Sequence, residues 1–368
     1  MLYFLYVLIL LTALVSFIMP ETQKANKLFQ WSNVIINFLI LFIIIGSATF
    51  NNDWIAYTNL FDGIVPVYDL LYVFGFKIFN LLGLSFTDFY AFNQFGIYIT
   101  ILFLISRFTS KYILIIVLAL LVLAGPNLSI LLRFYTAFVF FLVAAYFIIL
   151  KKKKILGYLF LVLAFLSHFG VIILAIFLFI QKYINIRKSF RIAATTAFAI
   201  YIFQSLFFAA LLATGLGSFA IYINDKSSLV GGIFVLLPYI PWIMLILLRH
   251  NFLMKNNSIV IGDKNYLFLY KLTLFSFFFL VLAIFLQIVL NRYVEPFIII
   301  WSLYLCYSIR FSKSNFRKYL FVIKIFILLL LSAYLKYFLP ISLLGSSEWL
   351  LHYLEILNSN KYKMFDVL

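Results

Sequence analysis

Two arginines and one histidine combine a residue type and a spacing that could support chemistry on a phosphate. Arg133 and Arg292 each precede a basic cluster by 18 residues, and His168 follows one by 14 residues. Along a helix these separations are about 27 Å and about 21 Å. All three side chains are therefore expected at the same outer boundary of a membrane, on different helices.

Two guanidinium groups at one membrane surface suit a lipid-linked diphosphate, because each stays charged and binds phosphate in bidentate fashion. A carboxylate or an imidazole nearby could take a proton from an attacking hydroxyl. Such a set would support glycosyl transfer with a polyprenyl diphosphate leaving group, with the arginines neutralising the developing charge and no metal required. The carboxylates and the tyrosine expected on the same side are Asp53, Tyr57, Asp62 and Asp69.

Each of these residues also has a structural interpretation. An arginine near a helix end can reach lipid head groups, and Arg292 can instead pair with Glu295 three residues later. Tyr57 and Tyr293 fit an interfacial aromatic belt. Residue types and spacing alone thus indicate an outer-leaflet site of unspecified chemistry.

Composition requires a lipid environment for most of the chain. Of its 368 residues, 66% are hydrophobic and 11% are charged, and the mean hydropathy is +1.15. Soluble domains carry about 25% charged residues. The net charge of +17 does not indicate nucleic acid, because lysines and arginines form short clusters between apolar runs. One cysteine and three unclustered histidines predict no disulfide and no metal site, and we expect no cofactor.

The apolar runs predict an all-α, polytopic membrane protein with about twelve transmembrane helices, forming a single integral membrane domain over 1–368. The first run reads as a retained helix and not as a signal peptide. The expected spans are 2–19, 32–50, 89–106, 112–126, 130–150, 155–167, 169–181, 192–213, 230–248, 266–290, 294–309 and 319–338.

Charge alternates between the connecting segments, and the positive-inside rule then predicts that both termini lie outside. Basic clusters on both sides of 155–181 require that segment to go out and return, with a hinge near 167–170. We expect 51–88 to be a long outer loop carrying an amphipathic helix at 66–84. A second outer segment is expected at 339–368, with an interfacial helix near 347–357.

The order of several short motifs resembles the EpsG family of polysaccharide-synthesis membrane proteins, which are Wzy-like polymerases. The matching pieces are Asn52-Asp53-Trp54 with Tyr57 and Phe61, then Pro66-Val67-Tyr68-Asp69, Leu132-Arg133-Phe134-Tyr135-Thr136-Ala137, the Lys151–Lys154 turn, Leu166-Ser167-His168-Phe169 and Asn291-Arg292-Tyr293.

The resemblance implies a glycosyltransferase that joins oligosaccharide repeat units carried on undecaprenyl diphosphate, for O-antigen, capsule or exopolysaccharide. It implies a site at the outer face of the bacterial cytoplasmic (inner) membrane and a GT-C-like helical bundle. The implied partners are the lipid-linked glycan and membrane lipid, with a chain-length regulator and a flippase as further candidates. Arg133 and Arg292 would hold diphosphates, His168 with Asp53 or Asp62 would supply the base or sugar contacts, and Tyr57, Tyr293 and Asp69 would bind substrate.

Other classes remain open. A flippase or transporter for lipid-linked sugars predicts internal repeats and charges near the bilayer midplane. The sequence has no convincing repeat, and most of its ionisable groups are expected at the membrane edges. An O-antigen ligase shares the arginine chemistry and differs in its acceptor. A membrane acyltransferase would face a cytosolic donor, and a scaffold would leave the outer arginines unexplained.

Overall fold

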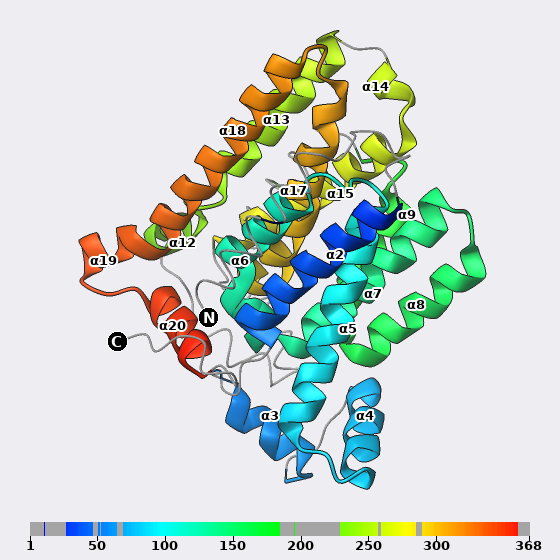
Figure 1. The fold of residues 1–368 in the computed structure, drawn as a ribbon, viewed down its shortest axis with the longest axis vertical. Helices are drawn as coiled ribbons and strands as arrows, with labels where there is room; N and C mark the ends of the chain where they lie inside the picture. The colour runs from blue at the N-terminus through cyan, green and yellow to red at the C-terminus, as the bar shows by residue number, and fades with distance from the viewer. Residues whose placement is uncertain are drawn as a thin grey trace.

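The computed structural model describes residues 11, 27–46, 51, 53–64, 69–184, 195, 229–256, 259–284 and 289–359. Within these ranges every regular element is a helix, as the sequence predicts (Figure 1). The expected spans at 2–19 and 192–213 lie outside the described residues, 195 excepted.

The first half of the bundle is built from the helices that precede residue 185 in the sequence. They are α2 (Lys27–Leu41), η1 (Phe42–Gly46), α3 (Trp54–Phe61), α4 (Leu70–Leu81), α5 (Phe86–Ser106), α6 (Ile113–Ile130), α7 (Leu132–Ala145), η2 (Tyr146–Leu150), α8 (Lys154–Ser167), η3 (Phe169–Val171) and α9 (Ile172–Ile180).

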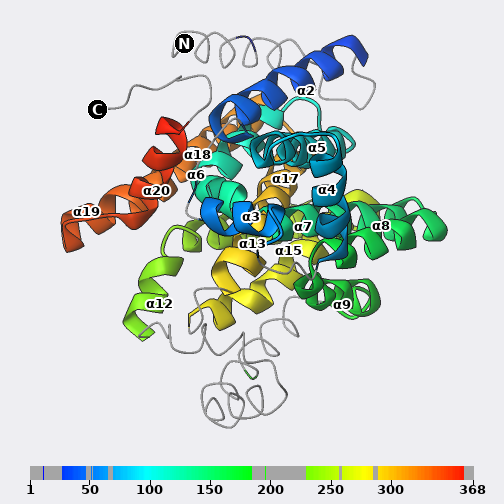
Figure 2. The same cartoon turned by 90° about the horizontal axis from the view of Figure 1, so that it is seen from below.

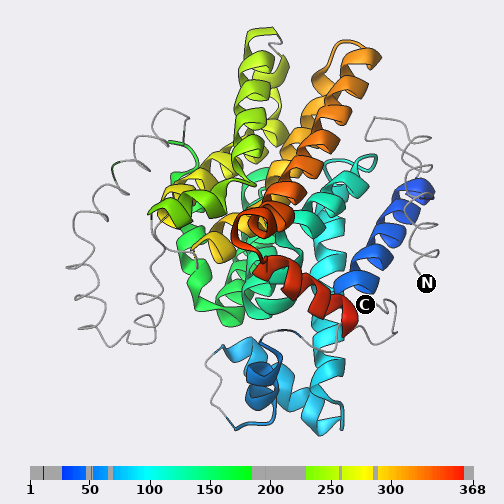
Figure 3. The same cartoon turned by 90° about the vertical axis from the view of Figure 1, so that its left-hand side faces the viewer.

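The second half contains the long pair α13 and α18, which project together beyond the other helices (Figures 1 and 3). Its elements are α12 (Leu229–Leu236), α13 (Ile240–Asn256), α14 (Ile259–Gly262), α15 (Lys264–Ala283), η5 (Leu290–Val294), η6 (Glu295–Phe297), α17 (Ile298–Ser308), η7 (Ile309–Phe311), α18 (Asn315–Ala333), η8 (Tyr334–Phe338), α19 (Leu339–Leu344) and α20 (Glu348–Asn358).

Six helical stretches are long and apolar enough to cross a membrane, which makes this a multi-pass membrane protein. They are Lys27–Gly46, Phe86–Ser106, Ile113–Ile130, Leu132–Leu150, Leu290–Phe311 and Asn315–Leu344. The six do not establish the expected number of twelve. The expected spans at 230–248 and 266–290 correspond to α12 with α13 and to α15, which are not among them.

The expected outer loop 51–88 contains two short helices at one end of the molecule. The α4 helix has 12 residues, about 18 Å, which is too short to span a membrane of about 30 Å. It buries Tyr72 and Phe76 and exposes several large apolar side chains on its other face. Viewed from below, α3 lies over the centre of the molecule and α4 beside it (Figure 2).

Aromatic packing holds this end together. Phe76 of α4 packs against Phe61 of α3 with ring centroids 5.3 Å apart, and against Phe89 of α5 at 4.7 Å. The α5 helix begins earlier than expected, because Ser85 and Asp88 form a capping box that satisfies its first backbone donors. These contacts fix the position of Asp69, the residue that precedes α4.

The break between α6 and α7 consists of the single residue Leu131. The α6 helix continues through Pro126 to Ile130, four residues beyond the expected end of its span. Arg133 is therefore the second residue of α7, at the end of the bundle that carries α3 and α4.

Candidate functional site

Asp69 contacts two of the three residues that the spacing singled out. The Nη1 atom of Arg133 donates a hydrogen bond to Oδ2 of Asp69 at 2.6 Å. The Nδ1 atom of His168 lies 3.6 Å from the same oxygen. The Asp69 side chain is only 11% exposed, so one shielded carboxylate lies between an arginine and a histidine.

Arg133 occupies an unusual position for a cation, because the N-terminus of a helix carries partial positive charge. Its guanidinium is compensated by Asp69 and lies over the Tyr57 ring, with Cζ 5.6 Å from the ring centroid. Its Nε atom is buried and has no hydrogen-bond partner among the described residues. An unsatisfied donor at this place suits a further anion.

His168 lies at the predicted hinge, and the structure confirms that hinge. The α8 helix ends at Ser167, His168 is extended, and a 3₁₀ turn leads into α9. The ring of Phe134 packs edge-on against His168 with centroids 5.6 Å apart. The residue after Arg133 thus supports the imidazole.

Arg292 and Tyr293 lie on η5, a π-helical segment followed by the 3₁₀ turn η6. The hydroxyl of Tyr293 donates to the carbonyl oxygen of Gly170 at 3.0 Å. The Tyr293 ring also contacts Phe134, with centroids 5.3 Å apart. The segment that carries Arg292 is thereby joined to the turn that carries His168.

Asp53 precedes α3 and interacts electrostatically with Arg133 and Arg292. Its backbone N–H donates to the side-chain oxygen of Asn51 at 2.9 Å, and the Asn51 amide donates to Ser129. Burial raises the pKa of Asp53 above its usual range, and the charges of Arg133 and Arg292 only partly oppose that effect. A carboxylate with a raised pKa is a better proton acceptor than an ordinary one.

Asp69 differs from Asp53 in this respect. Burial alone would raise the pKa of Asp69, but the neighbouring His168 and Arg133 outweigh that effect and lower it. Asp69 is therefore held as an anion and orients the side chains of Arg133 and His168, whereas Asp53 is the candidate proton acceptor of the two carboxylates.

The structure brings together most, but not all, of the predicted site residues. Asp62 is exposed at the C-terminal end of α3, nine residues from Asp53, or about 13 Å along the helix. It lies outside the cluster. The cluster comprises Asp53, Tyr57, Asp69, Arg133, His168, Arg292 and Tyr293.

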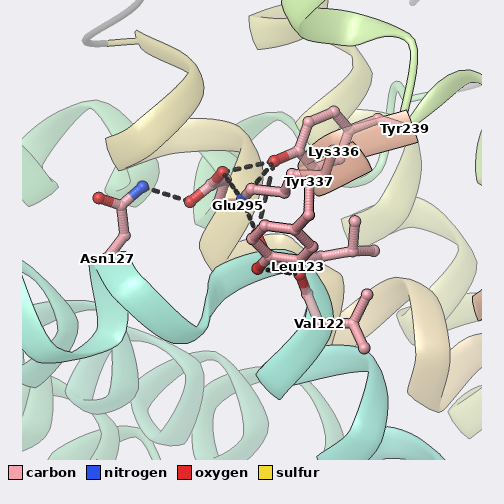
Figure 4. A network of polar contacts seen from close by, with 7 residues as sticks. All are labelled: Val122, Leu123, Asn127, Tyr239, Glu295, Lys336 and Tyr337. Atoms are coloured by element: carbon pink, nitrogen blue, oxygen red, sulfur yellow. Dashed lines mark hydrogen bonds and ion pairs between the residues drawn. The ribbon is translucent and has the colours of Figure 1, made fainter. Parts of the chain in front are cut away.

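A second polar network lies next to the cluster and was not predicted. Glu295, fully buried, is 2.7 Å from the buried ammonium of Lys336. Tyr239 donates to one oxygen of Glu295 and Asn127 to the other, while Lys336 also donates to the carbonyl of Leu123 (Figure 4). An acid and a lysine inside predicted spans were the available signal, because buried charges in membranes are costly and usually functional.

This network answers the open question about Arg292. The expected alternative was an ion pair between Arg292 and Glu295, but Glu295 pairs with Lys336 instead. Because Glu295 follows Arg292 by three residues, the network fixes the helix break on which Arg292 lies. Tyr337 adds a hydrogen bond to the carbonyl of Val122 at 2.6 Å.

The described residues contain no group of three or more His, Cys, Asp and Glu side chains that could hold a metal. Together, the helical fold and the cluster define a multi-pass membrane protein with converging arginine, histidine and carboxylate groups. A family model, the EpsG family, matches residues 31–350, and the chain belongs to this family. No curated protein and no solved structure matches it, and the GT-C-like architecture stays a prediction.

Proposed function

We propose that this chain is a polysaccharide polymerase that joins undecaprenyl-diphosphate-linked repeat units. The acceptor hydroxyl attacks the anomeric carbon of the growing chain, and a carbon–oxygen bond forms. The bond from that carbon to the diphosphate breaks, and undecaprenyl diphosphate leaves. The observation that carries this proposal is the convergence of Arg133, His168 and Arg292 on the two carboxylates Asp69 and Asp53.

The arginines are assigned to the diphosphate. Arg133 still has a buried donor without a partner, and Arg292 faces the same polar region from η5. Two guanidinium groups would neutralise charge as it builds on the leaving oxygen. The Tyr57 ring lies against the Arg133 guanidinium, and Tyr293 is bonded to the turn that follows His168, so both would contact the sugars or the phosphates.

A cavity beside the cluster offers room for the lipid chain of the substrate. It has a volume of about 470 Å³, which lies in the range typical of ligand sites, and it is lined mainly by apolar residues of α4, α5 and α7. Tyr72 and Thr136 line it, and they follow Asp69 and Arg133 by three residues on their helices. On a helix, residues three apart share a face. The lipid chain of a substrate whose diphosphate binds Arg133 would therefore extend directly into this cavity.

The proton of the acceptor hydroxyl goes to Asp53 or to His168. The raised pKa of Asp53 favours it as the base, while His168 lies beside the anionic Asp69. This pairing keeps the imidazole oriented. We place the site at the outer face of the bacterial cytoplasmic membrane, where a flippase would deliver units and a chain-length regulator would limit the product.

The test is a gel of lipid-linked glycans from cells that lack this protein, restored with the wild type, Arg133→Ala or Lys153→Ala. Lys153 lies in the exposed turn before α8 and is the matched control. We expect single repeat units without a ladder in the deletion strain and with Arg133→Ala. The wild type and Lys153→Ala should restore the ladder, with equal protein levels in the membrane fraction.

Two outcomes would redirect the assignment. A normal ladder in the deletion strain would exclude polymerisation and favour ligation or transport. A deletion strain in which repeat units accumulate only at the inner face would favour a flippase. If Arg133 binds the diphosphate, Arg133→Lys should also lose polymer, because an ammonium keeps the charge but not the bidentate geometry.

The cavity is tested separately. A Cβ atom at Gly96, which lines the cavity on α5, would meet nothing within 4 Å. Gly96→Leu should therefore fold and fill space assigned to the lipid chain, and polymer should fall. Gly262→Leu, at an equally open glycine on α14, is the control. Normal polymer from Gly96→Leu would remove the cavity from the proposal.

A further inference from the structure

Four cationic side chains line a second cavity, at the other end of the bundle from Asp69. The cavity has a volume of about 350 Å³, and its lining includes Arg107, Lys111, Lys151 and Arg310. These residues come from three separate connections: the segment between α5 and α6, the turn before α8, and η7, which follows α17. Lys151 follows Arg133 by 18 residues, about 27 Å along α7 and η2.

The cations are held in place without being neutralised. The Cζ atom of Arg107 lies 4.2 Å from the centroid of the Phe103 ring, and the Nζ atom of Lys151 lies 5.5 Å from that of Tyr146. An aromatic face attracts a cation but leaves its charge intact. None of the four forms an ion pair with an acid among the described residues.

The carboxylate that Arg310 reaches through Tyr307 is already engaged. Arg310 donates to the hydroxyl of Tyr307 at 2.7 Å, and that hydroxyl donates to Asp263 at 3.0 Å. Asp263 also accepts the backbone N–H of Tyr266 at 2.9 Å, as the N-cap of α15. One carboxylate with two donors leaves the cavity strongly positive.

The segment that supplies Arg107 and Lys111 is fixed before any ligand arrives. Gln30 of α2 donates to the carbonyl of Ser106 at 3.0 Å, and Asn33 donates to the carbonyl of Ser110 at 2.5 Å. A preorganised segment lowers the entropy that binding must overcome. Asn265 and Ser110 add polar atoms to the lining.

The positive-inside rule explains why basic residues lie at this end. It does not explain why four of them, from three connections, line one cavity instead of separate solvated surfaces. We propose that this cavity binds the phosphate group of an anionic ligand. The group belongs either to the head group of an anionic phospholipid or to a soluble phosphate, and both would form the same charge-assisted hydrogen bonds. The α6 helix, whose N-cap Tyr112 supplies no side-chain cap, starts beside the cavity and adds a favourable dipole.

The experiment measures the thermal unfolding midpoint of the purified full-length protein in neutral detergent. It is titrated with phosphatidylglycerol, with phosphatidylcholine and with inorganic phosphate. We expect the midpoint to rise with phosphatidylglycerol or with phosphate, and not with phosphatidylcholine. A response to inorganic phosphate identifies a soluble ligand, and a response to phosphatidylglycerol alone identifies a lipid head group.

The variant Arg107→Gln/Arg310→Gln should raise the concentration for half the effect by about tenfold or more, since charged hydrogen bonds are lost. The control Lys153→Gln/Lys154→Gln removes the same charge at the same end, from residues that do not line the cavity, and should leave that concentration unchanged. A second pair, Lys111→Gln/Lys151→Gln, should repeat the first result. Equal losses in cavity and control variants, or no response of the wild type to either anion, would overturn the proposal.

Discussion

Tyr293 and Gly170 are joined by a hydrogen bond of 3.0 Å across 123 residues of sequence. The contact brings the helix break that carries Arg292 against the turn that carries His168. It also explains the glycine. A Cβ atom at position 170 would lie 3.0 Å from the Tyr293 hydroxyl and 3.2 Å from Nε2 of His168.

Gly170→Ala should therefore disturb the cluster more than the fold. Tyr293 and His168 would each have to move by a few tenths of an ångström, and small displacements of reacting groups cost large factors in rate. We expect polymer yield to fall by roughly tenfold at unchanged protein level. Gly262→Ala, at an open position, should leave polymer unchanged. A full ladder from Gly170→Ala would show that this contact does not set the site geometry.

Asp69→Asn should destabilise the protein in a pH-dependent way. The lowered pKa of Asp69 means that the fold favours the anion, so its contribution is complete above the ordinary aspartate value of about 3.9 and disappears as pH falls through the lowered value. The melting temperature of Asp69→Asn should lie below that of the wild type at neutral pH. The two curves should converge only in strong acid, and a difference independent of pH would contradict this account.

Asp53→Asn should have the opposite effect on stability. Because the pKa of Asp53 is raised, the fold favours the protonated form, and stability falls as pH rises from about 3.9 through the raised value. Replacing the carboxylate should raise the melting temperature at neutral pH and change nothing in acid. The same variant should lose polymer, as expected where a functional group is kept at a cost in stability. A lower melting temperature at neutral pH would indicate that the arginine charges dominate.

Lys336→Met should destabilise strongly, because it leaves Glu295 buried without its partner. Breaking one side of a buried ion pair costs about 3–5 kcal/mol, which would be measured by denaturant unfolding in detergent. Lys324→Met, at an exposed lysine of the same helix, should have little effect. The double variant Glu295→Gln/Lys336→Met should recover most of the loss, and no recovery would mean that Lys336 acts through other contacts.

Residue positions that depend only on the rise of a helix could be predicted well from the sequence. Arg133, His168 and Arg292 were expected at one end because 14 or 18 residues of helix have a fixed length, and the hinge at His168 followed from basic clusters on both sides. Asp69 was predicted in the outer loop, but its place between Arg133 and His168 depends on aromatic packing of α4 against α3 and α5. No local pattern specifies that packing.

The network around Glu295 could not be predicted from the sequence, for a similar reason. Its members come from α6, from the segment before α13, from η6 and from η8, and only tertiary packing brings them together. The short-range pairing of Arg292 with Glu295 was a reasonable expectation at three residues' separation. A lysine 41 residues away takes that partner instead, because both groups are buried and each charge requires a counterion.

The hydrogen bond between Arg133 and Asp69 has a consequence for selectivity. In the resting protein this guanidinium already holds an internal anion. In the proposed function, a phosphate could bind the free Nε of Arg133 but would compete with that carboxylate for Nη1, so at Nη1 its binding would be an exchange of one anion for another. Weakly charged or singly bound anions gain little from such an exchange, whereas a diphosphate that engages Arg292 as well can outcompete Asp69. The carboxylate would thus act as a filter that admits only multiply charged ligands.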